Sequence, residues 1–392
     1  MEHVLDASQD LHSAVRLSTE EALQFVSGEA WAEWLAEHGV THVAMESTGV
    51  YWRPIFNLLE EHFTVILANA YHVKAVPGRK TDVRDAAWLL DLTQHGLIQG
   101  SFIPPAPIRE LRELTRYRKS LIEERTREVN RVQKVLEGAN IKLAAVASDV
   151  MGVSGRAMLQ AIVEGVDDAT QLADLARRGL RRKLPELQQA LQGRVLAHHR
   201  LLLRQLLAHI DFLDQQIKEL TQDIEERTRP FEAERELLVS IPGVGQRVFE
   251  VVIAEIGVDM GQFPSARHLC SWAAVCPANY ESAGKRLKNG TRHGDPWLRG
   301  ALLQAAWAAT HTKGYLRAQF QQIAKRRGEK RAVMAVAHSL LAIIYQLLSS
   351  HVSYQDLGDD YFHHLDADKR KEYLLRQLAE LGYEATVQPR AA

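Results

Sequence analysis

The sequence predicts an α/β domain at the N-terminal end of the chain, then a helical coiled-coil region and a mainly helical C-terminal domain. Three observations carry this prediction: strand-like segments that alternate with helix-like ones, a proline cluster that ends the alternation, and a long heptad repeat further on. The chain has 392 residues, which is enough for two or three domains. We therefore expect domains at 1–104, 105–233 and 234–350, and a charged tail at 351–392.

The first 104 residues alternate between two kinds of pattern. The apolar or alternating runs EHVLD, HSAVRL, THVAMES, TVILAN and SFIP are typical of strands, and the segments between them, such as EAWAEWLAEH, have helical spacing. Pro104, Pro105 and Pro107 then end the pattern, because proline restricts its own φ and moves the preceding residue away from helix. This alternation predicts an α/β domain that ends at the prolines.

The middle region has a heptad repeat and no convincing strand. Seven apolar residues follow one another at alternating spacings of 3 and 4: Leu203, Leu206, Ile210, Leu213, Ile217, Leu220 and Ile224. An earlier stretch, 108–136, has looser helical spacing and is dense in Arg and Glu, which is typical of an exposed helix. The two stretches fit the arms of one antiparallel hairpin. A seam of this length also predicts an assembly of at least two chains.

Composition excludes several classes of protein. Hydrophobic residues make up 46% and charged residues 25%, so the chain is neither disordered nor collagen-like. Cys270 and Cys276 are too few for a disulfide framework and form no Cys-x-x-Cys pair, so we interpret both as small core residues. The first residues carry charges and no apolar signal core, which favours a reducing cytoplasm as the location.

The most apolar stretch of the chain is 332–348. It is interrupted by His338, Ser339 and Gln346, and it falls short of the roughly 20 apolar residues that a membrane-spanning helix needs. We therefore predict a buried core helix and no membrane partner. His338 on this helix is better explained as a core histidine with a hydrogen-bond partner than as a metal ligand.

Charge is distributed unevenly along the chain. The net charge is -1, yet thirteen Lys or Arg residues lie between Pro264 and Arg331 against three acids, Glu281, Asp295 and Glu329. This basic segment attracts phosphate backbones, and the attraction is expected to depend on salt. A solvated charged face is the alternative, and the charge count alone does not separate the two.

Four acids of the first domain stand where an RNase H-like nuclease needs them. Asp6 ends the strand-like run VLD, Glu46 ends VAME, and Asp82 and Asp85 open a helical segment with both carboxylates on one face. Carboxylate oxygens are the ligands that Mg²⁺ requires when it bridges to phosphate. Each acid also has an ordinary explanation, because Asp82 fits a helix N-cap, Asp85 a first-turn acid and Asp6 a turn.

The segment Ile241-Pro-Gly-Val-Gly245 lies between two helical patterns. It resembles the hairpin of a helix-hairpin-helix module, in which Gly243 and Gly245 would let backbone N–H groups approach a phosphate. A dinucleotide-binding fold is excluded, because no strand precedes the glycines and a third glycine is lacking. An ordinary turn between two helices explains the spacing equally well.

A glycine- and lysine-rich loop, PANYESAGKRLKNGTRHG, contains a candidate nucleophile. Ser282 is followed closely by four cations, Lys285, Arg286, Lys288 and Arg292. A serine oxygen attacks phosphorus when its proton is removed and cations meet the developing negative charge, and this loop supplies the cations. His293 is the nearest candidate base. A serine that merely caps a turn is the ordinary alternative.

These residues together resemble a family, the DEDD transposases of bacterial insertion sequences of the IS-one-ten type, which are RNA-guided serine recombinases. The matching segments are ESTGVYWRPIFNLLE, PGRKTDVRDAAWLLDL, FIPPAPIRELRELTRYR, IPGVG, PANYESAGKR and WLRGALLQAAWAA, in the order of the family. At the first acid the match is Asp6-Ala-Ser-Gln9, where family members usually have Lys at the last position.

The resemblance implies a RuvC-like N-terminal domain, a coiled-coil middle and a C-terminal transposase domain with a nucleophilic serine. Asp6, Glu46, Asp82 and Asp85 take the four acidic positions that bind Mg²⁺. Ser282 takes the position of the nucleophile. The implied partners are donor and target DNA, an element-encoded guide RNA and further copies of the chain, as a dimer or tetramer.

The leading hypothesis is therefore a transposase that cuts and rejoins DNA with a Mg²⁺-binding acidic tetrad and a serine nucleophile. A RuvC-like metal nuclease that hydrolyses branched DNA, with Ser282 uninvolved, is one alternative. A non-catalytic DNA-binding scaffold, in which the acids are structural, is the other. A covalent protein–DNA adduct, free cut ends or neither product distinguishes the three.

Overall fold

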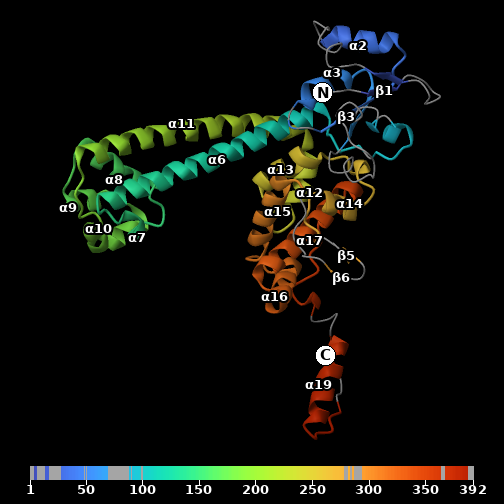
Figure 1. The fold of residues 1–392 in the computed structure, drawn as a ribbon. Coiled ribbons are helices and arrows are strands. Elements are labelled where there is room, and N and C mark those ends of the chain that lie inside the picture. The colour runs from blue at the N-terminus through green and yellow to red at the C-terminus, as the bar shows by residue number, and fades with distance from the viewer. Residues whose placement is uncertain are drawn as a thin grey trace. The chain divides into compact units, whose positions relative to one another are not determined.

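The computed structural model of the chain divides into two units, Met1–Ala106 and Pro107–Ala392 (Figure 1). Most of the described chain is helical, with one four-stranded sheet in the first unit, as the patterns predict. The structure describes residues 4–6, 14–16, 28–47, 49, 51–68, 88–89, 91–98, 100–277, 281–282, 285–286, 294–362 and 367–386.

The sheet of the first unit has the strand order β2-β1-β3-β4. Its strands are β1 (Val4–Asp6), β2 (Ala14–Arg16), β3 (His42–Glu46) and β4 (Thr64–Ala68). The pair β3–β4 is parallel, whereas β1 runs antiparallel to both β2 and β3. A parallel pair needs a crossover connection, and α3 (Trp52–Leu59) supplies it.

The core of the first unit lies between the sheet and its helices α2 (Gly28–Glu37) and α3. Alternation along β3 buries Val43 and Met45. The other buried side chains of this core include Trp31, Leu35, Phe56, Leu59 and Leu67. The predicted strand SFIP is absent, since a single bridge between Gly100 and Ala68 is all that forms there. The prolines that follow have no N–H with which to extend a ladder.

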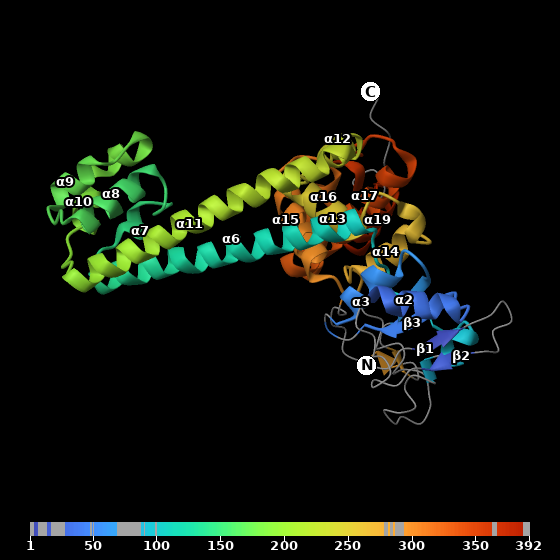
Figure 2. The same cartoon turned by 90° about the horizontal axis from the view of Figure 1, so that it is seen from above.

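Two long helices, α6 (Ala106–Gly138) and α11 (Ala197–Thr228), lie side by side in both views (Figures 1 and 2). Ion pairs join Glu110 to Arg227 and Arg125 to Asp214, and the His209 ring lies 3.5 Å from the Glu128 carboxylate. The residue numbers rise along α6 as they fall along α11, so the helices are antiparallel. The predicted seam is buried at four of its positions and half-buried at the others, Leu206, Ile217 and Leu220.

A small helical module, not expected from the sequence, connects the two long helices. Its elements are α7 (Leu143–Val146), α8 (Val153–Glu164), α9 (Ala169–Asp174), the 3₁₀ helix η1 (Arg178–Lys183) and α10 (Leu184–Ala190). Met158, Leu159 and Ile162 of α8 share a core with the ends of both long helices. For this reason Leu207, outside the heptad seam, is buried as well. We call residues 139–196 the tip module.

The C-terminal helices surround α17 (Glu329–Ser350), which packs against α14 (Ala266–Trp272), α15 (Pro296–Ala309) and α16 (Tyr315–Arg327). Among the described residues α17 is the one helix long and apolar enough to cross a membrane, and about half of its apolar window is buried in this core, including Val336, Leu340 and Ile344. The prediction of a core helix is therefore confirmed. A further helix, α19 (Ala367–Glu380), follows near the C-terminus.

The side chain of Cys270 contacts the backbone of His338 in this core. The Cys270 thiol lies 3.7 Å from the carbonyl oxygen of His338, and burial raises the pKa of Cys270 to about 12. Burial also lowers the pKa of His338. Both residues are thus held in their uncharged forms, as the interpretation of them as core residues expects.

Candidate active site and nucleic-acid interface

Asp6 and Glu46 each occupy the last position of a strand. Because β1 is antiparallel to β3, Asp6 stands opposite His42, at the start of β3. Glu46 is four residues further along β3, which corresponds to about 13 Å at the usual rise per residue. The structure therefore does not bring Asp6 and Glu46 to the same end of the sheet, since the ends of consecutive strands converge only when the strands are parallel.

Asp82 and Asp85 lie outside the described residues. Within the described ranges no group of three or more His, Cys, Asp or Glu side chains could hold a metal ion. Glu46 is half-buried at the carboxyl end of β3, beside Ala68 of the parallel strand β4. The donor set itself, composed of carboxylates, has the chemistry that Mg²⁺ requires.

Ser282 belongs to a short β-hairpin. The strands β5 (Glu281–Ser282) and β6 (Lys285–Arg286) pair antiparallel, and residue 285 stands opposite residue 282. Opposed Cα atoms of such a pair are about 4.5–5.5 Å apart. The backbone register therefore places one of the predicted cations beside the candidate nucleophile. Lys288, Arg292 and His293 lie outside the described residues.

Gly294, immediately before the cap of α15 (Pro296–Ala309), is closely packed. At Gly294 an added Cβ would lie 2.5 Å from the Cβ of Ala274 and 2.7 Å from the carbonyl oxygen of Trp272, so no larger residue fits. Asp295 caps α15, since its carboxylate accepts hydrogen bonds of 2.8 Å from the backbone N–H groups of Trp297 and Leu298. The start of α15 is thus fixed by close packing at Gly294 and by the helix cap at Asp295.

A buried ionic network joins α6 to this cap. The guanidinium of Arg116 donates two hydrogen bonds, of 2.8 and 2.7 Å, to the buried Glu255 carboxylate on α13 (Gln246–Ile256). The same guanidinium donates to Asp295 at 3.1 Å. Arg112 adds a hydrogen bond to the Glu255 backbone carbonyl. One arginine of the hairpin therefore connects α13 with the start of α15.

Two further contacts extend this interface along α6. Arg118 donates to the buried Glu250 carboxylate, one turn and a half before Glu255 on α13. The ammonium group of Lys119 lies 4.8 Å from the centre of the Trp297 ring, within cation–π range. The predicted exposed helix is thus correct only in part, because its first turns bury paired arginines. Both partners of each ion pair are needed for stability, because removing one of them leaves the other as an unpaired buried charge.

The IPGVG turn connects α12 (Glu232–Val239) to α13. Gly243 has a φ of +88°, and an added Cβ would lie 2.2 Å from the carbonyl oxygen of Ala305 on α15. Gly243 is therefore required for close packing between the turn and α15. Gly245 is exposed, with no atom within 4 Å of an added Cβ. Of the two glycines, Gly245 is the one whose backbone is open to a ligand.

The described part of the basic segment exposes its cations at the end of α16. Lys325, Arg326 and Arg327 form the last turn of this helix, and Lys330 and Arg331 follow in α17. All five are exposed and none forms an ion pair with a described carboxylate. Such a group is available for phosphate.

Two family models match the chain, in the same order as its structural parts. The DEDD model, described as a transposase of the IS110 type, matches residues 3–141, and the model described as transposase of the IS116/IS110/IS902 family matches residues 235–321. Together they cover more than half of the chain. The chain belongs to the IS110 family of transposases.

Curated relatives of this IS110-family chain have names of the same kind. A protein named as a transposase, y4rJ, of Sinorhizobium fredii is 26% identical over 64% of this chain and 60% of its own length. The transposase of insertion sequence element IS1111A of Coxiella burnetii is 31% identical over 30% of the chain and 33% of its own. The pilin gene-inverting protein of Moraxella bovis is 28% identical over 29% and 36%. The chain thus spans less than two thirds of each of these relatives.

The family segments include residues whose role was missed from the sequence. Arg112, Arg116 and Arg118 lie in the segment IRELRELTRYR, and they bind Glu250 and Glu255. The available signal was the helix QRVFEVVIAEI, where two acids interrupt an otherwise apolar pattern. An acid in such a helix either lies at an exposed position or is buried beside a cation. The spacing of residues along the helix does not identify that cation.

The Glu255 carboxyl gives the network a pH dependence. Burial raises the pKa of Glu255 from 4.5 to about 7, while the guanidinium of Arg116 opposes this effect. Between these two values the folded state binds the proton that the unfolded state has released. The contribution of the protonated Glu255 carboxyl to the free energy of unfolding is therefore largest at low pH, and it is lost as the pH rises from 4.5 to 7.

We expect Glu255→Gln to remove this dependence. In urea denaturation followed by circular dichroism, the unfolding free energy of the natural chain relative to the variant should fall by about 2–3 kcal/mol between pH 5 and pH 8. Glu110→Gln, which changes an exposed acid of α6, is the matched control and should leave the profile unchanged. Identical pH profiles for the natural chain and Glu255→Gln would contradict the prediction.

Proposed function

We propose that this chain is a DNA transposase that cuts and rejoins DNA, with an acidic metal-binding set in the first unit and Ser282 as the nucleophile in the second. The observation that carries the proposal is the match of both family models in order along one chain. At the finer level we propose an RNase H-like, RuvC-like first domain and a coiled coil formed by α6 and α11. The domain limits 1–104, 105–233 and 234–350 remain part of this proposal.

Glu46, Asp82 and Asp85 are proposed to hold Mg²⁺, with Asp6 as the fourth member that the family resemblance implies. A bound Mg²⁺ would neutralise negative charge on the phosphoryl group. The carboxylates keep the ion in place, and the half-buried position of Glu46 at the end of β3 supports its assignment. The register of β1 supports Asp6 less, because it stands at the other end of β3.

Ser282 is proposed to attack phosphorus directly. Its Oγ–P bond forms as the P–O bond to the leaving strand breaks, and the hydroxyl proton passes to a base while the leaving strand ends as a hydroxyl. In rejoining, a hydroxyl of the partner strand attacks and Oγ leaves with a proton. The covalent intermediate conserves the phosphodiester energy that hydrolysis would lose. The register of the hairpin supports this role, since residue 285 stands opposite residue 282.

A gene-inverting protein among the relatives also supports cutting with rejoining. Inversion of a DNA segment needs both ends to be rejoined, and the name of the Moraxella bovis protein describes such an inversion. A nuclease that only hydrolyses DNA would not fulfil this task. The proposal for this chain is therefore recombination rather than hydrolysis.

The proposed partners are donor and target DNA, an element-encoded guide RNA and further copies of the chain. The exposed cations at the end of α16 and the open backbone at Gly245 support nucleic-acid binding. Paired strand cuts require paired active sites, which favours a dimer or tetramer in the cytoplasm. Sedimentation of the chain with DNA as a monomer would contradict this assembly.

The experiment that tests the function is a cleavage assay with end-labelled element DNA. The full chain is incubated with Mg²⁺, with and without the element RNA, and products are resolved on denaturing gels. We expect a covalent protein–DNA adduct and rejoined strands that depend on RNA. Free cut ends alone would indicate a hydrolytic nuclease, and no product at all would indicate a binding scaffold. Full recombination without RNA would refute the guide.

A further inference from the structure

The tip module contains a dense run of cations. Arg177, Arg178, Arg181, Arg182 and Lys183 fall within seven consecutive residues, and all five are exposed. None of them forms an ion pair with a described carboxylate. By contrast, two other arginines at this end of the hairpin are paired, Arg156 with Asp211 and Arg200 with Asp167. The run is therefore a concentration of unneutralised charge.

The backbone at this run is strained. Arg178 has a φ of +53°, a left-handed conformation that glycine or asparagine adopts more easily than arginine. Gly179, the next residue, has no such φ. A residue in this conformation costs about 1 kcal/mol or more, which surrounding structure must offset.

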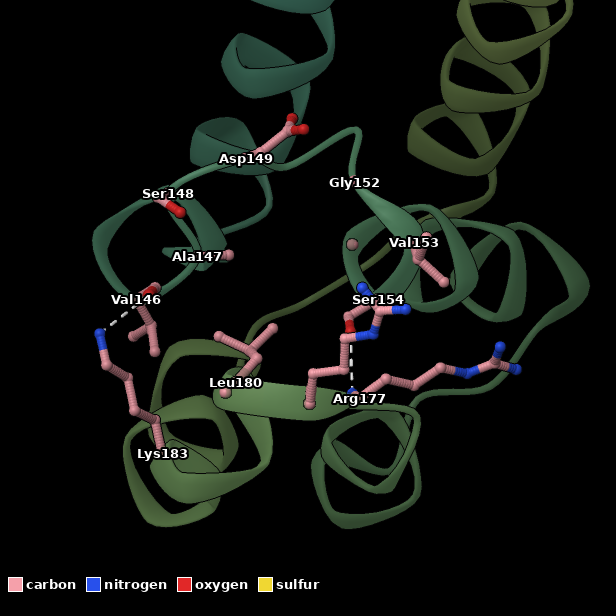
Figure 3. Close-up of a pocket in the computed structure, with 13 residues that line it drawn as sticks. Val146, Ala147, Ser148, Asp149, Gly152, Val153, Ser154, Arg177, Leu180 and Lys183 are labelled. Carbon is pink, nitrogen blue, oxygen red and sulfur yellow. Dashed lines mark hydrogen bonds between the residues drawn. The ribbon is translucent and has the colours of Figure 1, made fainter.

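Three of the cations, Arg177, Arg178 and Lys183, border a hollow of about 630 Å³ (Figure 3). Its walls come from residues 146–149, 152–155, 177–180 and 183. Arg181 and Arg182 belong to the same 3₁₀ helix as Lys183 but lie outside this lining. The backbone N–H of Arg177 donates to the Ser154 hydroxyl at 2.9 Å, and the Lys183 ammonium lies 3.5 Å from the Val146 carbonyl oxygen. These contacts hold the cationic segment against the rest of the module.

The hollow combines cations with hydroxyl groups. Ser148 and Ser154 line it, and Asp149 is the one acid among its lining residues. The Asp149 carboxylate already accepts a hydrogen bond of 2.9 Å from the backbone N–H of Met151. Its size lies in the range of ligand sites, and it would admit a sugar–phosphate unit. Val146, Ala147, Val153 and Leu180 give the hollow apolar walls, and the cations that border it suit phosphodiester oxygens.

We propose that the tip module is a second nucleic-acid-binding surface, at which Arg177, Arg178, Arg181, Arg182 and Lys183 hold the sugar–phosphate backbone of a bound strand. Residues 142–196 of the module, which include all five cations, lie outside both family models, which cover residues 3–141 and 235–321. This surface is thus an addition to the segments that define the family. The choice of nucleic acid as the partner rests on the proposed function, because a recombinase must bind nucleic acid at positions beyond the cleaved phosphate.

The test measures binding by the full chain in chelator, so that no chemistry takes place. Labelled duplex DNA and labelled single-stranded RNA are titrated at several salt concentrations. The variant changes all five cations to glutamine, as R177Q, R178Q, R181Q, R182Q and K183Q. We expect at least a tenfold loss of affinity at about 0.1 M salt and a decrease of about 3–4 in the slope of log K against log salt, since each phosphate contact contributes about 0.7–0.9.

The charge-matched control removes five exposed cations elsewhere on the hairpin, as R127Q, K134Q, R204Q, K218Q and R229Q. It should change the salt slope by less than about 1. A second variant, Arg178→Gly, relieves the left-handed strain, so it should fold at least as well as the natural chain and still bind several-fold more weakly. This variant separates lost binding from lost folding.

The probe whose affinity falls in the five-residue variant identifies the nucleic acid that the tip module binds. Loss with RNA alone assigns the surface to RNA, and loss with the duplex alone assigns it to DNA; both outcomes support the proposal. Unchanged affinity and salt slope for both probes in the five-residue variant would overturn it, and the surface would then serve a protein partner or remain solvated. A chain that binds at the tip but forms no DNA adduct refutes the proposed function and leaves this inference standing.

Discussion

Ser282→Ala should abolish the covalent protein–DNA adduct and strand exchange, with a loss of at least about 1,000-fold, and leave DNA binding intact. The methyl group of alanine cannot form a bond to phosphorus, so no group remains to conserve the phosphodiester energy. The hairpin of β5 and β6 should be unaffected, because its ladder is made by backbone groups. The measurement is the denaturing-gel assay for adduct, together with a binding titration.

Ser265→Ala is the matched control for this experiment. Ser265 precedes α14 in the same domain, and its hydroxyl lies 2.9 Å from Nδ1 of His268. Its replacement should leave adduct formation within about twofold of the natural chain. The hydroxyl of Ser240 already donates a hydrogen bond to the carbonyl oxygen of Leu237, in the preceding turn of its own helix. An adduct mapped by mass spectrometry to any serine other than Ser282 would overturn the assignment.

Asp82→Asn should reduce cleavage by at least about 100-fold at saturating Mg²⁺ while folding stays near that of the natural chain. Asparagine retains the size of aspartate but removes the charge that holds the ion. Glu46→Gln should give a loss of the same order, because Glu46 is assigned to the same acidic set. Cleavage rates are measured against Mg²⁺ concentration, and activity that persists in excess chelator would contradict the metal site.

Asp6→Asn and Asp91→Asn complete the comparison. Asp91 is an exposed acid of the same unit that contacts His95, so its change should have no effect on cleavage. Asp6 stands opposite His42 rather than near Glu46, and its change should therefore retain more than about a tenth of the activity. A loss at Asp6 as complete as that at Asp82 would show that β1 pairs differently in the active enzyme.

Local patterns in the sequence were sufficient for several parts of the fold. The heptad spacing predicted α11, because a repeat of 3 and 4 residues corresponds to one face of a helix whatever lies against it. The apolar run at 332–348 predicted a core helix for a similar reason. The prolines at 104–107 predicted an end to the strand pattern, since the restriction on φ is local to each proline. Each of these features depends on neighbouring residues alone.

The candidate site shows the limit of such reasoning. Asp6 and Glu46 were correctly placed at strand ends, but the end of the sheet at which each strand finishes depends on the direction of its partner. The residue types suited to metal binding could thus be identified, whereas their distance could not. The position of Ser282 in a hairpin beside residue 285 likewise follows from strand pairing, which a single loop sequence does not determine.

The sequence by itself predicted the heptad helix, the buried core helix and the end of the strand pattern, and it offered residue types suited to phosphate chemistry. Tertiary structure alone decided that the half-buried Arg116 pairs with Glu255 and the buried Arg118 with Glu250, that Gly243 packs on α15, and that residues 139–196 share a core with the ends of both long helices. The physical reason is that the sequence around a charged residue or a glycine is the same whether that residue is exposed to solvent or packed in an interface. Its environment is set by residues far away in the sequence, such as Glu255 for Arg116 and Ala305 for Gly243, which periodicity does not record.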